Sequence, residues 1–282
     1  MSFDFLIPVA TYPDPTSKDG LRRALNLAAK ITGRVTAIVH EVDIAPVHSL
    51  LAEAVLDVSG MTAEAEARSR ERGSDVASWL EERAGRLDLD VTIRKTRCRP
   101  EAIADLLVHA SRTYDLTLLA LDPRSGPQRD LAESIIFGSG GPVLVVAAQE
   151  AFLPVADQVI TAMSVFLAWD GSRAAARALR DAMPVLALAA TVSVLTVDDD
   201  KPIDAASIAA VLEFLAHHGI HSRHVGRSRG SLPVGEVLLA AAADADLLVM
   251  GAYGHNRMRE FILGGATRTV LANARMPILM SH

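Results

Sequence analysis

The feature that most constrains the fold is an internal repeat of domain size. Near the end of each half a proline opens an Ala- and Leu-rich helical stretch, an apolar run follows, and a second apolar segment closes the half. The matched landmarks are Pro100 and Pro233, the runs 115–122 and 246–254, and the segments 141–148 and 276–280. These three pairs are separated by 133, 131 and 135 residues. The near-constant offset indicates a tandem duplication of two domain-sized units.

Short β-branched runs alternate with helical stretches in each half. In the second half we expect strands at 165–170, 191–197, 221–226, 246–250 and 276–280, and helices at 172–189, 206–219, after Pro233, and at 266–274. In the first half we expect strands at 3–10, 34–42, 89–97, 115–122 and 141–148, and helices at 20–32, 61–86 and after Pro100. Continuous apolar runs are typical of strands buried on both faces. The pattern predicts an α/β fold of two tandem domains, each an open, five-stranded, mainly parallel sheet with helices on both faces.

The predicted domains are residues 1–149 and 159–282, joined by a linker at 149–158. Residues 43–60 have no counterpart in the second half and are expected to be an insertion, either a lid or an interface hairpin. In the first half, Gly138 to Gly141 lead directly into the last strand, so we expect little room there for a helix with a free N-terminus.

Composition excludes several classes of protein. The net charge of −6 leaves no basic surplus to neutralise a nucleic-acid backbone. The single cysteine, Cys98, excludes an intrachain disulfide and a cysteine-rich zinc site. The N-terminus has no basic signal region, and no apolar run reaches the roughly 18 residues that a membrane helix needs. We therefore expect a cytoplasmic protein that binds neither nucleic acid nor membranes.

Ligands of open parallel sheets bind beyond the carboxyl ends of the strands. There the second half carries an acid, Asp170, and a glycine-rich loop that leads into the last helix. Glycines before a helix N-terminus expose backbone N–H groups to an anion. Thr267 adds a hydroxyl donor, and the Asp170 carboxylate can accept hydrogen bonds from an adenine amino group or a ribose hydroxyl. Each residue alone also has a purely structural explanation, as a turn or a helix cap.

This combination resembles the universal stress protein family over nearly the whole chain. The specific residues are FLAWDGS near the start of the second half and GAYGHNRMREFILGGATRTVL near its end. Members that bind ATP carry G-x2-G-x9-G-(S/T), and Gly251, Gly254 and Gly264 match that spacing. At the next position Gly265 replaces the Ser or Thr, which removes one hydroxyl donor but keeps the backbone N–H. The resemblance implies the Rossmann-like fold of the adenine-nucleotide alpha hydrolase type.

The resemblance also implies a site for ATP or another adenine nucleotide, with or without magnesium, and a role for each of its residues. Asp170 would hold the adenine or ribose, Val197 would contact adenine through its backbone, and Met250 would flank the nucleotide. Phosphates would meet the hydroxyl of Thr267 and backbone groups of Gly251, Gly254, Gly264 and Gly265.

The first half departs from the pattern. Ala10 or Thr11 stands where the second half has its acid, and LDPRSGPQRD follows the fourth strand without the glycine pair. We interpret this half as a non-binding structural partner. Because family members commonly pair through their last strands, 141–148 and 276–280 are expected to form a pseudo-dimer within one chain. A homodimer and a protein partner in a stress response stay open.

Other constellations predict no further site. The histidines 217, 218, 221 and 224 have tempting metal spacing, but we interpret them as a solvated edge. The charges between Glu64 and Arg72 predict an exposed helix face, and Arg257, Arg259 and Arg268 flank the glycine loop. No phosphate loop with its lysine and no nucleophile elbow is present, so no catalytic residue is assigned. Two alternatives remain: a ligand-free interaction scaffold and a slow ATPase.

Overall fold

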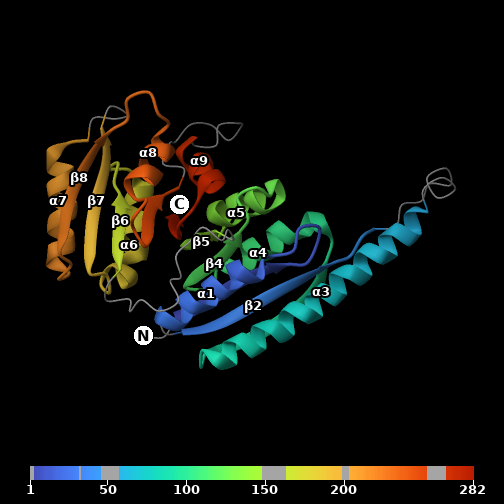
Figure 1. Ribbon diagram of the computed structural model, residues 1–282. Helices are drawn as coiled ribbons and strands as arrows, with labels where there is room; N and C mark the ends of the chain where they lie inside the picture. Colours follow the sequence, from blue (N-terminus) through green and yellow to red (C-terminus); the bar gives the residue numbers. More distant parts are fainter. Residues whose placement is uncertain (1–2, 32, 46–56, 148–162, 199–202, 253–264) are drawn as a thin grey trace.

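The computed structural model describes residues 3–31, 33–45, 57–147, 163–198, 203–252 and 265–282, and it contains one continuous ten-stranded sheet (Figure 1). The strands are β1 (Phe3–Ala10), β2 (Gly33–Val42), β3 (Asp90–Cys98), β4 (Leu116–Leu121), β5 (Val143–Ala147), β6 (Ser164–Ala168), β7 (Thr191–Asp198), β8 (Ser222–Ser228), β9 (Leu247–Gly251) and β10 (Ile278–Ser281). Their spatial order is β3-β2-β1-β4-β5-β10-β9-β6-β7-β8. The expected α/β fold is confirmed.

Each half is a parallel five-stranded sheet, and the two sheets join through one antiparallel pair. All pairs within a half are parallel, whereas β5 and β10 run antiparallel with Leu144 opposite Leu279. The expected pairing of the two last strands within one chain is therefore present. Because this pair is antiparallel, the carboxyl ends of the strands in the first half and those in the second half lie at opposite edges of the joint sheet.

Helices cover both faces of this sheet. They are α1 (Lys18–Ile31), α3 (Val58–Arg86), α4 (Ile103–Ser111), α5 (Gly126–Gly138), α6 (Arg173–Leu186), α7 (Ala205–His217), α8 (Val234–Ala241) and α9 (Gly265–Asn273). Side chains of α1, α3, α6 and α7 bury one apolar cluster against the sheet, and those of α4, α5, α8 and α9 bury a second. Both clusters contain residues of both halves. Apolar burial on both faces explains why central strands such as β4 and β5 show no polar alternation, whereas the edge strands β3 and β8 are polar and largely exposed.

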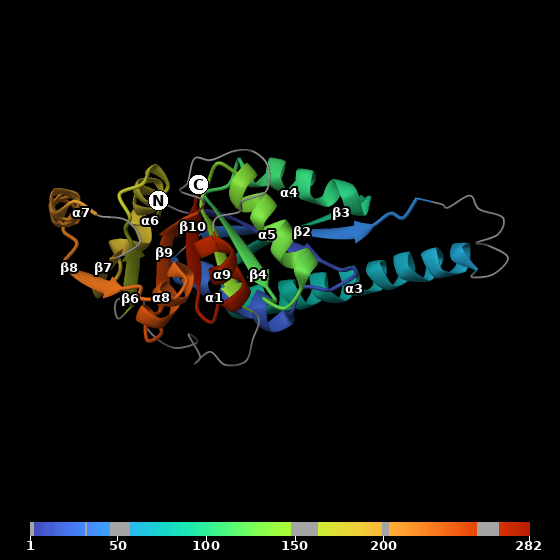
Figure 2. The ribbon, with the colours of Figure 1, turned by 90° about the horizontal axis from the view of Figure 1, so that it is seen from above.

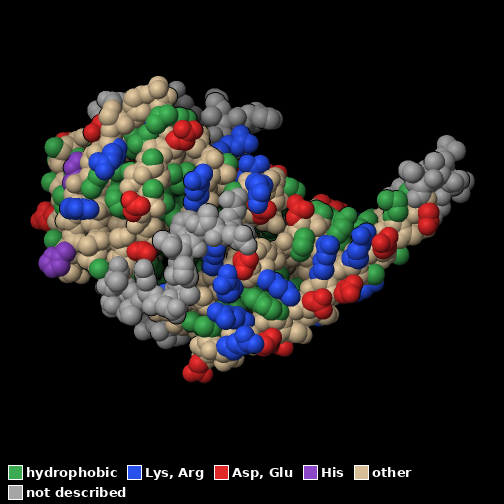
Figure 3. All heavy atoms as spheres, viewed as in Figure 1, with side chains coloured by type: hydrophobic (Ala, Val, Ile, Leu, Met, Phe, Trp, Pro, Cys, Tyr) green, Lys and Arg blue, Asp and Glu red, His purple; other side chains and the backbone are tan. Residues whose placement is uncertain are grey.

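The largest departure from the repeat is the helix α3. It has 29 residues, whereas its counterpart α7 has 13. The N-terminal part of α3, which we call the arm and which includes Glu66 and Ser69, extends beyond the sheet (Figure 2). Acidic and basic side chains alternate along it (Figure 3). The predicted insertion 43–60 thus ends within a helix, and most of the extra length of α3 lies beyond it, after residue 60. Residues 46–56 lie outside the described residues.

Candidate functional site

The site predicted in the second half lies at the carboxyl edge of β6, β7 and β9. The strand β6 is hydrogen-bonded to β7 on one side and to β9 on the other. The chain passes from β6 through α6 to β7 on one side of β6. It then forms β8 and returns through α8 to β9 on the other side of β6. This is the point at which strand order reverses, where open α/β sheets leave a crevice for ligands.

Asp170 lies in the tight turn between β6 and α6. It is exposed, and its Oδ1 accepts a hydrogen bond from the backbone N–H of Ser172 at 2.9 Å. Gly171 between them has a φ of 71°, which a residue with a side chain rarely adopts. Ser172 then caps α6 by accepting from the backbone N–H of Ala175. The turn therefore holds the Asp170 carboxylate at the carboxyl edge of β6, in addition to any role it has toward a ligand.

Val197 and Met250 come from the strands on either side of β6. Both side chains are buried, 7% and 3% exposed, and both belong to the apolar cluster on the α8 and α9 face. Their side chains thus belong to the apolar core between the sheet and the helices α8 and α9.

Gly251 has a packing role that its place in the glycine motif does not reveal. A Cβ at this position would lie 2.5 Å from the backbone carbon of Ala174 and 2.5 Å from the backbone nitrogen of Ala175. Both atoms belong to the first turn of α6, which cannot rotate away as a side chain can. The glycine lets β9 and α6 approach closely, whether or not its backbone also meets a phosphate.

The first turn of α9 shows two opposite environments. Gly265 is exposed, and a Cβ built on it would meet none of the described residues within 4 Å. Thr267 is only 2% exposed, so the structure places its side chain inside the fold. Among the described residues nothing crowds the first residue of this helix, which suits an anion at its N-terminus. Gly254 and Gly264, the other glycines of the predicted motif, lie outside the described residues.

Hydrogen bonds at the amino edge show which residue of the first half matches Asp170. Asp115 directly precedes β4 and accepts from the backbone N–H of Asp4 at 2.9 Å. Asp246 directly precedes β9 and accepts from that of Ser164 at 2.8 Å. Asp4 and Ser164 are therefore equivalent, and six residues further along the chain Ala10 corresponds to Asp170. The first half lacks the acid.

His40 stands in the first half at the place of Val197. It pairs in the sheet with Ala10, the residue that matches Asp170, and Val197 lies two residues beyond Leu195, the partner of Ala168. The His40 side chain is 2% exposed, and its Nδ1 has no hydrogen-bond partner. Burial lowers the pKa of His40 to about 4, so the imidazole is neutral near pH 7. Neither the composition nor the spacing of the sequence pointed to this residue.

The expectation that the first half has little room for a helix before its last strand is wrong. The helix α5 begins at Gly126. Four residues separate β4 from α5, whereas thirteen residues separate β9 from α9. Ser125 caps α5 by accepting from the backbone N–H of Gln128, and its hydroxyl donates to the Asp14 carboxylate at 2.9 Å. A carboxylate of the chain itself thus stands beside the N-terminus of α5. The Gly138–Gly141 run had obscured the helix signal given by Ser125 and the following proline.

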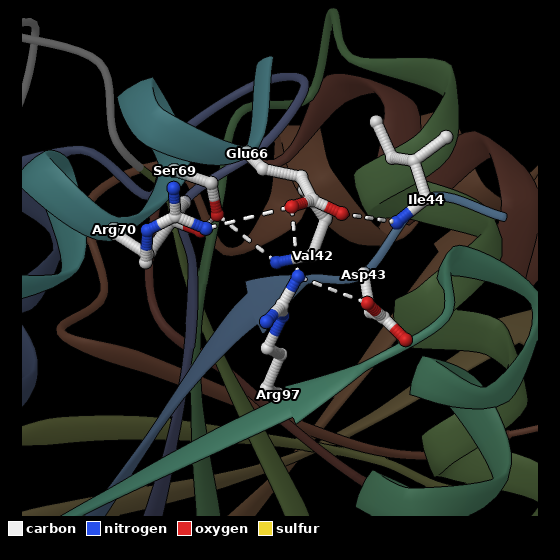
Figure 4. Close-up of polar contacts among 8 residues, drawn as sticks. Val42, Asp43, Ile44, Glu66, Ser69, Arg70 and Arg97 are labelled. Atoms are coloured by element: carbon white, nitrogen blue, oxygen red, sulfur yellow. Dashed lines mark hydrogen bonds and ion pairs between the residues drawn. The ribbon is translucent and has the colours of Figure 1, made fainter. Parts of the chain in front are cut away.

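The arm closes the rest of this edge in the first half (Figure 4). Thr11 donates to the carbonyl of His40 at 2.8 Å and shares a hydrogen bond of 2.6 Å with Ser69 of α3. Ser69 also accepts from the backbone N–H of Val42 at 3.0 Å. Ser69 and Thr11 are both buried. A side chain of α3 therefore fills the space beyond the ends of β1 and β2.

The charge run on α3 is only partly the exposed face that its sequence predicts. Glu66 turns toward β2 and β3, where it accepts from the backbone N–H of Ile44 at 2.9 Å and pairs with Arg97 at 2.7 Å (Figure 4). Arg97 also pairs with Asp43 at 3.0 Å. The hydrogen bond from Ile44, and then the pairing with Arg97, lower the pKa of Glu66. Glu66 thus fastens the arm to the sheet.

The remaining sequence candidates do not form a second site. Within the described residues no three His, Cys, Asp or Glu side chains gather as a metal site would require. His224 instead hydrogen-bonds to Thr196 at 2.9 Å. Arg268 lies 3.8 Å from Glu133 of α5, and Arg257 and Arg259 lie outside the described residues. No helix among the described residues is long and apolar enough to cross a membrane.

Comparison with known proteins agrees with this architecture. Residues 163–282 match the model of the Universal stress protein family. The second half is a universal stress protein domain. A universal stress protein from Archaeoglobus fulgidus is similar over 100% of this chain and 96% of its own, with 15% identity and a TM-score of 0.73. A protein of unknown function from Pseudomonas aeruginosa is similar over 98% and 92%, with 16% identity and a TM-score of 0.56. These likenesses show the fold of the whole chain. A search of curated proteins returned no match.

Proposed function

We propose that this protein is a regulatory nucleotide-binding protein of the universal stress response, with one site for ATP or a related adenine nucleotide in its second half. In this proposal Asp170 holds the adenine or ribose, and Val197 and Met250 border the base. Gly251, Gly254, Gly264 and Gly265 present backbone groups to the phosphates, with Thr267 behind them. The first half, residues 1–149, is a structural partner that binds no nucleotide, and an unidentified protein reads the occupancy of residues 159–282.

The observation that carries the proposal is the contrast between the two carboxyl edges. The second half presents an exposed acid at a strand-order reversal and a helix whose first residue, Gly265, is exposed and uncrowded by any described residue. Membership of this half in the universal stress protein family supports a nucleotide as the ligand. In the first half the matching positions hold Ala10 and a buried His40, and Asp14 stands beside the N-terminus of α5.

Calorimetric titration of the full chain with ATP, ADP and AMP tests the proposal. We expect Asp170→Ala to weaken binding by about tenfold or more, because it removes a hydrogen bond to a charged group. Asp14→Ala is the matched control, since it removes an acid from the corresponding edge of the first half. It is expected to leave the affinity unchanged. Equal affinity in the wild type and Asp170→Ala would contradict this assignment.

A ligand-free scaffold is the second candidate, and the first turn of α9 favours it. Gly265 offers no hydroxyl, and the Thr267 side chain is buried. A scaffold predicts no heat with any of the three nucleotides and no change in melting temperature, whereas a bound ligand raises that temperature by mass action.

A further inference from the structure

The seam between the two halves has an approximate two-fold axis, and the axis passes between β5 and β10. Val143 begins β5 opposite Thr117 of β4, and Ile278 begins β10 opposite Leu248 of β9. Val143 and Ile278 are therefore equivalent, and so are the next residues, Leu144 and Leu279. These last two face each other in the antiparallel pair, so they lie at the axis.

A second pair of equivalent residues also meets at the axis. Glu133 lies five residues before Gly138, the last residue of α5, and Arg268 lies five residues before Asn273, the last residue of α9. Each helix ends five residues before its strand begins. Figure 1 shows α5 beside α9, and the Glu133 carboxylate lies 3.8 Å from the Arg268 guanidinium.

A position on a two-fold axis meets its own copy when two identical units pair. Two first halves joined in this geometry would bring Glu133 against Glu133. Two second halves would bring Arg268 against Arg268. Only the pairing of unlike halves places opposite charges at this position, and like charges in contact disfavour association.

The surroundings of the pair strengthen this discrimination. The Glu133 side chain is only 15% exposed, and burial raises the pKa of its carboxyl. A second carboxylate at this point would therefore be poorly solvated. The Arg268 side chain is 63% exposed, so water screens its charge more than that of Glu133. The discrimination therefore comes mainly from the Glu133 side of the pair.

Another contact across the seam is also one-sided. Arg177 of α6 donates to the carbonyl of Gly140 in the first half at 2.7 Å. Its counterpart is Arg23, since each arginine directly precedes the third buried residue of its helix. Arg23 donates instead to the carbonyl of Ala147 in its own half, at 3.0 Å. The two equivalent arginines thus contact different halves, Arg177 across the seam and Arg23 within its own half.

We propose that the Glu133–Arg268 position selects the pairing of unlike halves, so that the surface of α5 and β5 accepts the α9 and β10 surface and rejects a second copy of itself. The partner that this surface fits is the second half of a chain of this protein. The inference concerns the seam alone and does not depend on nucleotide binding.

Thermal unfolding of four full-length proteins tests the pairing: wild type, Glu133→Arg, Arg268→Glu and the double reversal. We expect each single reversal to lower the melting temperature by about 1–3 °C, and the double reversal to recover most of the loss. Raising the salt to about 1 M should shrink the single-reversal losses. Arg86→Glu, which breaks an exposed pair with Glu82 inside α3, controls for a change of charge away from the seam. Losses that add in the double reversal would overturn the proposal.

Sedimentation equilibrium tests the rejection of like halves. A chain with Glu133→Gln and Arg268→Gln has neither the attraction between unlike halves nor the repulsion between like ones. We expect its dimerisation constant to exceed that of the wild type by about threefold or more at low salt. A double-glutamine chain that dimerises no more than the wild type would overturn the proposal.

Discussion

The two halves share strand order, helix placement and a joint core, yet the described residues at their carboxyl edges differ, with Ala10 and His40 in the first half where the second has Asp170 and Val197. In the second half, thirteen residues connect β9 to α9, and no described residue crowds Gly265 at the start of that helix. In the first half, four residues connect β4 to α5, and Asp14 stands beside the start of that helix. The comparison teaches that the same fold can present different carboxyl edges, depending on the length of one loop and on a few polar side chains.

The tight junction of β9 and α6 gives the largest expected effect. Gly251→Ala places a methyl group 2.5 Å from backbone atoms of Ala174 and Ala175. Because backbone must move, we expect a loss of about 3 kcal/mol in the free energy of unfolding, measured by denaturant titration. Gly265→Ala is the control, since its Cβ meets open space and should change stability little. Similar losses in both variants would show that the glycine motif has no packing component.

The buried His40 makes the first half sensitive to acid. Its pKa of about 4 in the folded protein lies below the ordinary value of 6.5, so the unfolded chain binds more protons between these values. Stability is fully present above pH 6.5 and falls as the pH drops toward 4, by about 3 kcal/mol in total.

Denaturant titrations across this pH range measure the effect. His40→Leu should remove this contribution to the slope, whereas changing the exposed His224 to Asn should leave it in place. An unchanged slope in His40→Leu would refute the assignment.

The arm is expected to depend on the hydroxyl of Ser69. Ser69→Ala leaves the buried N–H of Val42 without its partner and removes the hydrogen bond to Thr11, which should cost about 1–3 kcal/mol of stability. Ser74→Ala on the same helix removes an exposed hydrogen bond to Lys95 and should cost far less. Equal losses would mean that α3 does not close the first edge through Ser69.

The smallest predicted effect is a gain of function. Gly265 stands where ATP-binding members of the family carry Ser or Thr, and space for a side chain is open there. Gly265→Ser should restore a hydroxyl donor worth about 0.5–1.5 kcal/mol, or about a two- to tenfold tighter binding of ATP by calorimetry. Gly265→Ala separates the hydroxyl from the added methylene. Weaker binding by the serine variant than by the alanine variant would argue against a phosphate at this turn.

Much of this organisation was predictable from the sequence. Apolar runs such as 115–122 and 141–148 predicted strands, and the structure forms β4 and β5 there with every residue buried. The landmarks that repeat at near-constant offset predicted the tandem duplication, and the family resemblance implied the pairing of the two last strands, which the structure contains. Asp170 and Gly265 were predicted to lie at strand and helix ends, and the structure places them there.

The sequence failed where side chains distant in the chain meet. Nothing near Thr11 indicated that Ser69 would cover it, or that Glu66 would turn inward to Arg97. The helix α5 was missed because a run of glycines after it outweighed its serine cap. Gly251 was assigned to phosphate contact alone, since its packing against α6 depends on the crossing of two elements.

The central claim is that nucleotide binds only at the edge of the second half. Photolabelling of the full chain with an azido-adenine analogue of ATP, followed by peptide mapping, tests it most directly. The account predicts labelled peptides from residues 163–282 alone, with labelling suppressed by excess ATP and by Asp170→Ala. Specific labelling of peptides around Ala10, His40 or Ser125 would contradict it, because it would mean that the edge of the first half is open.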